Sequence, residues 1–155
     1  MIQRIQSVYL LLAAIFSGLC FTGNIVKFSD NSGNILAVRP IGLVRITGNT
    51  LIEHIEKLLP LTVLLIVIPI VSITTIFLYK NRKRQKTFTS GLIALIILLI
   101  ITLIYYSVTI LQNYNVTFSP GIIMFFPLLM LICAFLAYRG IKKDDELVKS
   151  YDRLR

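Results

Sequence analysis

Four long apolar stretches dominate the chain, and shorter polar segments between them carry nearly all of its charges. The stretches cover residues 5–22, 58–79, 88–111 and 121–138, and none contains Asp, Glu, Lys, Arg or His. A helix needs about 20 apolar residues to cross about 30 Å of hydrocarbon. The pattern therefore predicts a membrane protein of the all-α class, a bundle of four transmembrane helices.

The first stretch could also be part of a cleaved signal peptide, because Arg4 precedes an apolar run of limited length. Cleavage needs small side chains at the cut, but the bulky Phe21 follows Cys20. A lipid-attachment site is disfavoured as well, since Leu19 stands where a small residue is needed. We therefore expect the first stretch to remain as a membrane helix.

The placement of basic residues predicts the orientation. Short cytoplasmic loops are rich in Lys and Arg, and translocated loops are not. The link between the second and third stretches and the start of the tail hold Lys80, Arg82, Lys83, Arg84, Lys86, Arg139, Lys142 and Lys143. Residues 112–120 carry no charge. Both termini are thus expected in the cytoplasm.

Composition supports a lipid environment. Hydrophobic residues make up 56% of the 155 residues and charged residues 15%, whereas soluble domains average about 25% charged residues. The net charge of +9 could indicate nucleic-acid binding. However, the basic residues flank the apolar stretches, and they do not interleave with aromatic residues on one face. The lipid bilayer is the expected partner, and no nucleic acid is expected.

Two external segments, 23–57 and 112–120, are predicted to form a small antiparallel sheet over the outer ends of the helices. Alternation and turn residues indicate strands at 25–28, 35–39 and 43–46, with a fourth at 115–118. The sequence Thr50-Leu51-Ile52-Glu53 matches a helix capping box. It predicts a helix over residues 50–58 that continues into the second stretch.

Candidate chemistry is sparse, so we expect neither an enzyme nor a bound metal or cofactor. His54 is the single histidine, and we interpret it as a surface residue beside an i,i+4 pair of Glu53 and Lys57. Cys20 and Cys133 are expected to be small buried residues too far apart for a disulfide.

Within the stretches, hydroxyl side chains are expected to bond to helix carbonyls, their own or a neighbour's. They are Thr62, Ser72, Thr74, Thr75, Thr102, Ser107 and Thr109. Pro69 and Pro127 are expected to bend the second and fourth helices.

The tail, residues 139–155, is predicted to be a cytoplasmic amphipathic helix separated from the membrane domain, 1–138, by a break at Gly140. Its acidic residues come early and its basic residues late, which suits a helix dipole. Leu147, Val148, Tyr151 and Leu154 form its apolar side. Two interpretations stay open: a solvated helix near the lipid headgroups, or a helix that docks on a cytoplasmic partner.

Both ends of the chain resemble a known family. The opening MIQRIQSVYLLLA and the closing KDDELVKSYDRLR are similar to those of an uncharacterised family of small four-span membrane proteins of Bacteroidota, a domain of unknown function. The resemblance implies a bacterial inner membrane and supplies no catalytic residues. The layout alone is also claudin-like, but the Trp of the claudin loop signature is missing, since the chain has no Trp.

The leading hypothesis for function is a non-enzymatic accessory or scaffold subunit of a larger membrane protein complex. The alternative is a small transporter or channel component formed by oligomerisation. Ionisable residues inside a membrane mark transport pathways, and none lies within the four stretches. An enzyme acting through residues near the outer surface, such as His54 and Glu53, is the least favoured hypothesis.

Overall fold

Four long helices form the body of the protein. The computed structural model describes residues 3–30, 34–47, 51–114 and 116–153, and side chains within them except at 3–4, 47, 51–54, 80 and 147–153. The helices are α1 (Gln3–Leu19), α2 (Leu59–Phe77), α3 (Arg82–Tyr114) and α4 (Phe126–Arg153). Each lies in a segment long and apolar enough to cross a membrane, which confirms four long apolar helices at the predicted positions.

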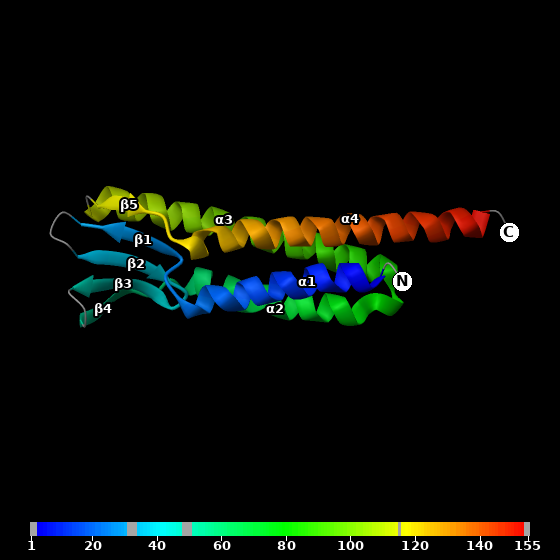
Figure 1. Cartoon of the computed structure of the whole chain (residues 1–155), viewed down its shortest axis with the longest axis horizontal. Helices are drawn as coiled ribbons and strands as arrows, with labels where there is room; N and C mark the ends of the chain where they lie inside the picture. The colour runs from blue at the N-terminus through cyan, green and yellow to red at the C-terminus, as the bar shows by residue number, and fades with distance from the viewer. Residues whose placement is uncertain (1–2, 31–33, 48–50, 115, 154–155) are drawn as a thin grey trace.

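The helices pack as a closed ring in which α1 and α3 each contact both α2 and α4 (Figure 1). Most of its interior side chains are apolar, among them Leu10, Leu61, Leu65, Leu92, Ile96, Leu99, Met130 and Ala134. Large apolar side chains also point outward, among them Ile66, Ile70, Ile101 and Phe135. A bundle that is apolar on both its inner and outer faces suits hydrocarbon surroundings and not water.

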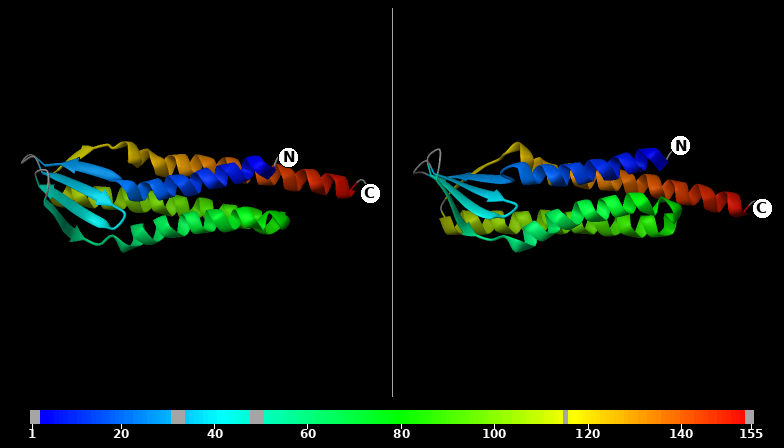
Figure 2. Two further views of the ribbon diagram at one scale, coloured as in Figure 1. Left: turned by 60° about the horizontal axis from the view of Figure 1, so that its bottom comes forward. Right: turned by 90° about the horizontal axis from the view of Figure 1, so that it is seen from below.

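A five-stranded antiparallel sheet covers one end of the bundle, and both termini lie at the other (Figures 1 and 2). We call the end with the termini the sheet-distal end. The strand order is β4-β3-β2-β1-β5. The strands are β1 (Val26–Ser29), β2 (Ile35–Arg39), β3 (Gly42–Thr47), β4 (Leu51–Glu56) and β5 (Thr117–Ser119). The predicted antiparallel sheet is therefore present, with one strand more than expected.

The sheet and the bundle share one core because α3 is longer than a span. Its 33 residues extend about 50 Å, whereas the hydrocarbon is about 30 Å thick. The end of α3 runs alongside the sheet (Figure 2). There Ile110 belongs to the same buried cluster as Phe28 of β1 and Leu36 of β2.

The second external segment pairs with the first, as predicted, but one to two residues later than expected. Thr117–Ser119 of β5 lies antiparallel to β1, with Phe28 opposite Phe118. The two rings meet edge to face, with their centroids 5.9 Å apart. Val116 precedes the strand and is buried.

The predicted helix over residues 50–58 is wrong, and with it the i,i+4 pair of Glu53 and Lys57. Residues Leu51–Glu56 form β4, which pairs with β3 and places Val44 opposite His54. Thr50, the proposed cap, lies outside the described residues. A capping-box match is a local signal, and here pairing with an existing strand outweighs it, helped by the β-branched Ile52 and Ile55.

The expected break in the fourth helix is also wrong. The helix α4 passes through Gly140 without a break, so the tail continues the fourth span. Pro127 is the second residue of α4, after the short 3-10 helix η3 (Ile122–Phe125). Proline is tolerated in the first turn of an α-helix, and the bend at Pro127 stays a prediction. Pro69, in contrast, lies inside α2 as expected.

Candidate functional site

The described residues hold no cluster of three His, Cys, Asp or Glu side chains that could bind a metal ion. Cys20 and Cys133 are both free thiols. His54 and Glu53 lie in β4, and their side chains are outside the described set. Two features with charged and polar side chains lie instead at the sheet-distal end, a set of contacts and a cavity.

The first feature is a set of contacts around Asp144 that joins three helices, here called the Asp144 network. Gln6 Nε2 of α1 donates a 2.7 Å hydrogen bond to Asp144 Oδ2 of α4. Both side chains are buried, at 3% and 8% exposure. Arg82 Nη1, at the start of α3, donates to the Asp144 carbonyl oxygen at 3.2 Å. The network fixes how α4 leaves the bundle.

Gly140 makes the approach of α1 to α4 possible. It lies one turn before Asp144, and a Cβ placed there would stand 2.9 Å from Gln6 Cγ and 3.3 Å from Gln6 Nε2. The first separation is shorter than real Cβ contacts. The glycine therefore serves close helix packing here, where its sequence context had suggested a helix break.

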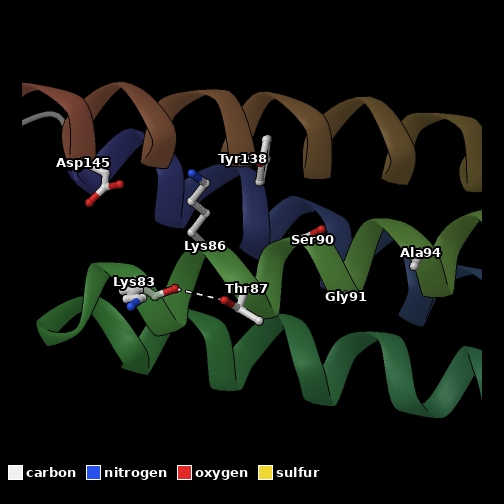
Figure 3. A pocket seen from close by; sticks show the side chains of 8 residues that line it. All are labelled: Lys83, Lys86, Thr87, Ser90, Gly91, Ala94, Tyr138 and Asp145. Carbon is white, nitrogen blue, oxygen red and sulfur yellow. Dashed lines mark hydrogen bonds between the residues drawn. The ribbon is translucent and has the colours of Figure 1, made fainter.

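The second feature is a cavity of about 760 Å³ between α3 and α4. Lys83 and Lys86 of α3 line it together with Tyr138 and Asp145 of α4 (Figure 3). Lys86 extends from α3 toward α4 beside Tyr138 (Figure 3). The hydroxyl of Thr87, which also lines the cavity, donates to the Lys83 carbonyl at 3.2 Å.

Farther toward the sheet, the same cavity is lined by the small residues Ser90, Gly91 and Ala94. A second hollow, about 520 Å³ in volume, adjoins it and shares Gly91 and Ala94. Its other lining residues are apolar, Val71 of α2 with Phe88, Leu95 and Leu98 of α3, so this hollow lies on the α2 side of α3. The two hollows make one groove along α3 that is basic at its sheet-distal end and apolar beyond.

Within the bundle, hydroxyl groups bond to backbone carbonyls, as predicted. Between helices, Ser72 Oγ of α2 donates to the Leu10 carbonyl at 2.5 Å and Ser17 Oγ of α1 to the Leu65 carbonyl at 2.9 Å. Thr62 donates to the carbonyls of Pro40 and Leu58. The others bond within their own helices: Thr74, Thr75, Thr102, Ser107 and Thr109. These groups therefore hold the helices and their ends together.

The structure gathers the predicted basic residues at the sheet-distal end. Arg82, Lys83, Arg84 and Lys86 lie in the first turns of α3. On α4, Arg139, Lys142 and Lys143 lie on the turns before and beside Asp144, and Lys142 Nζ is 3.9 Å from Glu146 Oε1. The side chains of Lys80, Leu147, Val148 and Tyr151, and all of Leu154, lie outside the described residues.

Sequence reasoning missed Gln6, Tyr138 and the role of Asp144. The sequence pattern places Asp144 only among the acidic residues near the start of the tail helix. A polar Gln6 at the edge of an apolar span was the available signal, since a buried amide needs a partner. Its partner lies 138 residues away in sequence, so spacing alone could not identify it.

The chain belongs to a protein family of unknown function. The family model described as "Domain of unknown function (DUF4293)" matches residues 2–154, nearly the whole chain. This agrees with the resemblance found at the two ends of the sequence. Among curated proteins, none matches the chain.

Proposed function

We propose that this member of the family is a non-enzymatic accessory or scaffold subunit of a larger membrane protein complex. It would lie in a bacterial inner membrane with both termini in the cytoplasm. The observation that carries the proposal is helix α4, whose 28 residues run unbroken from the fourth span into the tail. The end of α4 projects beyond the other helices at the sheet-distal end (Figure 1).

The projecting part of α4 is suited to binding a partner because its direction is set in advance. Gln6 and Arg82 hold the helix at Asp144, immediately before the projecting turns. By helical spacing, Leu147 and Tyr151 fall on one stripe with Val148 beside it, and the stripe leads toward Leu154. A helix ordered before binding loses less conformational entropy on docking than a flexible tail would.

The cytoplasmic orientation is supported by the distribution of charge. The sheet-distal end holds both termini, the basic start of α3 and the basic second half of α4. The five basic residues from Lys80 to Lys86 precede or begin a helix whose first turn has no acidic residue. Positive charge at a helix N-terminus opposes the helix dipole. Its presence there is better explained by the retention of Lys and Arg on the cytoplasmic side.

The proposal is tested on the tagged full chain, produced in its own cells and purified in a mild detergent. The variant Leu147→Ser/Tyr151→Ser removes apolar area from the stripe, where a buried aliphatic or aromatic side chain contributes about 1.5–3 kcal/mol. We expect a membrane protein present in stoichiometric amount with the original chain to be lost from this variant, as measured by quantitative mass spectrometry.

The matched control is Lys149→Ser/Arg153→Ser, which alters the same helix away from the stripe and should keep the partner. Equal recovery of every partner from the Leu147→Ser/Tyr151→Ser variant contradicts docking and leaves a solvated helix. If only further copies of the chain itself are recovered, the oligomeric transporter or channel is favoured.

A further inference from the structure

We propose that the groove along α3, bordered by α4 at its basic end and by α2 at its apolar end, binds an anionic glycerophospholipid. The phosphodiester would lie at Lys83 and Lys86, and an acyl chain would follow Gly91 and Ala94 into the apolar part. This inference goes beyond the accessory role and does not depend on it.

The polar end of the groove has the charge that an anionic headgroup needs. Lys83 and Lys86 are one helical turn apart on α3, and both line the same cavity. Asp145 is the one acidic residue among the lining residues, and Arg82 and Arg84 lie on either side of Lys83 in the sequence. The local charge is therefore positive. Basic pockets between membrane helices on the cytoplasmic side are known to hold phospholipid headgroups.

The headgroup also finds hydroxyl groups. Ser90 on α3 and Tyr138 on α4 line the cavity beside the lysines, whereas the Thr87 hydroxyl donates to the Lys83 carbonyl (Figure 3). A phosphodiester oxygen accepts hydrogen bonds from both ammonium and hydroxyl donors, and bonds with a charged partner are the stronger kind. Lys86, which reaches toward α4, is placed to contact a group lying between the two helices.

The rest of the groove has the shape and polarity for an acyl chain. Gly91 leaves open space on α3, since a Cβ added there would meet no atom within 4 Å. The adjoining hollow is lined by Phe88, Leu95 and Leu98. From Lys83 to Leu98 the helix rises about 22 Å, which covers a headgroup and the roughly 15 Å of one hydrocarbon leaflet.

Length and polarity together favour a lipid over a free phosphate. A soluble anion would use only the lysine end and leave an apolar groove about one leaflet deep without a function. A zwitterionic phosphatidylcholine would bring its quaternary ammonium group against the lysines. An anionic lipid such as phosphatidylglycerol satisfies both ends of the groove.

The test measures lipid retention by native mass spectrometry on the full chain. The protein is exchanged into detergent with equal amounts of dioleoyl phosphatidylglycerol and dioleoyl phosphatidylcholine. We expect the original chain to prefer phosphatidylglycerol by about tenfold or more, given two lysine contacts near the membrane surface. Lys83→Gln/Lys86→Gln should remove most of that preference, while Lys80, Arg82 and Arg84 keep the link basic.

The variant Gly91→Leu tests the acyl chain. An added Cβ meets no protein atom within 4 Å, so we expect the fold to be kept. The rest of the side chain would occupy the groove, and retention of phosphatidylglycerol should fall about tenfold, the scale of losing a few buried methylene groups. Gly18→Leu is the matched control, a helical glycine on α1 that also has no atom within 4 Å of an added Cβ. It should retain lipid like the original chain.

Three outcomes would overturn the proposal. The original chain could retain both lipids equally, the lysine variant could keep the full preference, or Gly91→Leu could bind phosphatidylglycerol as well as Gly18→Leu does. A fourth arm adds soluble glycerol phosphate at millimolar concentration. If it displaces the lipid completely, the site recognises a free phosphate group and the acyl-chain part is wrong.

Discussion

The carboxylate of Asp144 lies almost fully buried, next to a buried amide from the opposite end of the chain. Gln6 Nε2 donates to it at 2.7 Å. Buried polar groups are stable only when their hydrogen bonds are made, and removing one partner leaves the other with an uncompensated desolvation cost. Asp144 and Gln6 are therefore expected to depend on one another.

Replacing Asp144 with Ala should lower the free energy of unfolding by about 1–3 kcal/mol, because the Gln6 amide is left buried without its acceptor. Unfolding of the purified chain by SDS titration in mixed micelles measures the change. Lys143→Ala, at the exposed neighbouring position, should change stability little. Asp144→Asn keeps an acceptor oxygen and should fall between the two. Equal stability of Asp144→Ala and Lys143→Ala would contradict a role for the hydrogen bond.

At the scale of elements, the external sheet depends on a strand from each of the two external segments. β1 and β5 are joined antiparallel, with Lys27 opposite Ser119. Both of these side chains are exposed. Directly opposed residues in antiparallel strands have Cα atoms about 4.5–5.5 Å apart, inside the limit of about 7 Å for a disulfide.

The double variant Lys27→Cys/Ser119→Cys, in a chain with Cys20→Ala and Cys133→Ala, should therefore form a disulfide on mild oxidation. Non-reducing gel electrophoresis after proteolysis between the two positions detects the link. Lys27→Cys/Thr117→Cys is the matched control, because its partners are diagonal and about 7–8 Å apart. Equal cross-linking of the two pairs, or none in either, would show the register to be wrong.

The elements also show where local sequence signals fail. The strands β1 to β3 were predicted closely because Val26, Phe28, Leu36 and Val38 place apolar side chains toward a common core, and the structure buries all four. The strand β4 was missed because its capping-box pattern is a local feature, whereas pairing with β3 is a tertiary one. Gly140 was misinterpreted for the same reason, since its neighbour Gln6 belongs to another helix.

At the scale of the whole molecule, the proposed orientation is tested by chemical labelling. In the cysteine-free chain, Ser119→Cys should react with a membrane-impermeant maleimide in intact cells, because it lies exposed at the sheet end. Glu146→Cys, exposed at the sheet-distal end, should react only after permeabilisation. The expectation follows from the concentration of Lys and Arg at the sheet-distal end. The reverse pattern would refute the cytoplasmic placement of the termini.

The sequence by itself determined the four spans and the small antiparallel sheet. Both follow from patterns that are local: uninterrupted apolar length for a helix in hydrocarbon, and alternation with turn residues for a strand. The basic link and tail likewise predicted an orientation, which the labelling experiment can test.

The tertiary structure alone decided which distant residues meet. It paired Gln6 with Asp144, made β4 a strand, and continued α4 through Gly140. It also brought Lys86 and Tyr138 to one groove. The physical reason is that such contacts depend on how whole helices and strands pack. The local sequence pattern shows which faces of the helices and strands are apolar. Which helix or strand packs against each face is determined only by the tertiary structure.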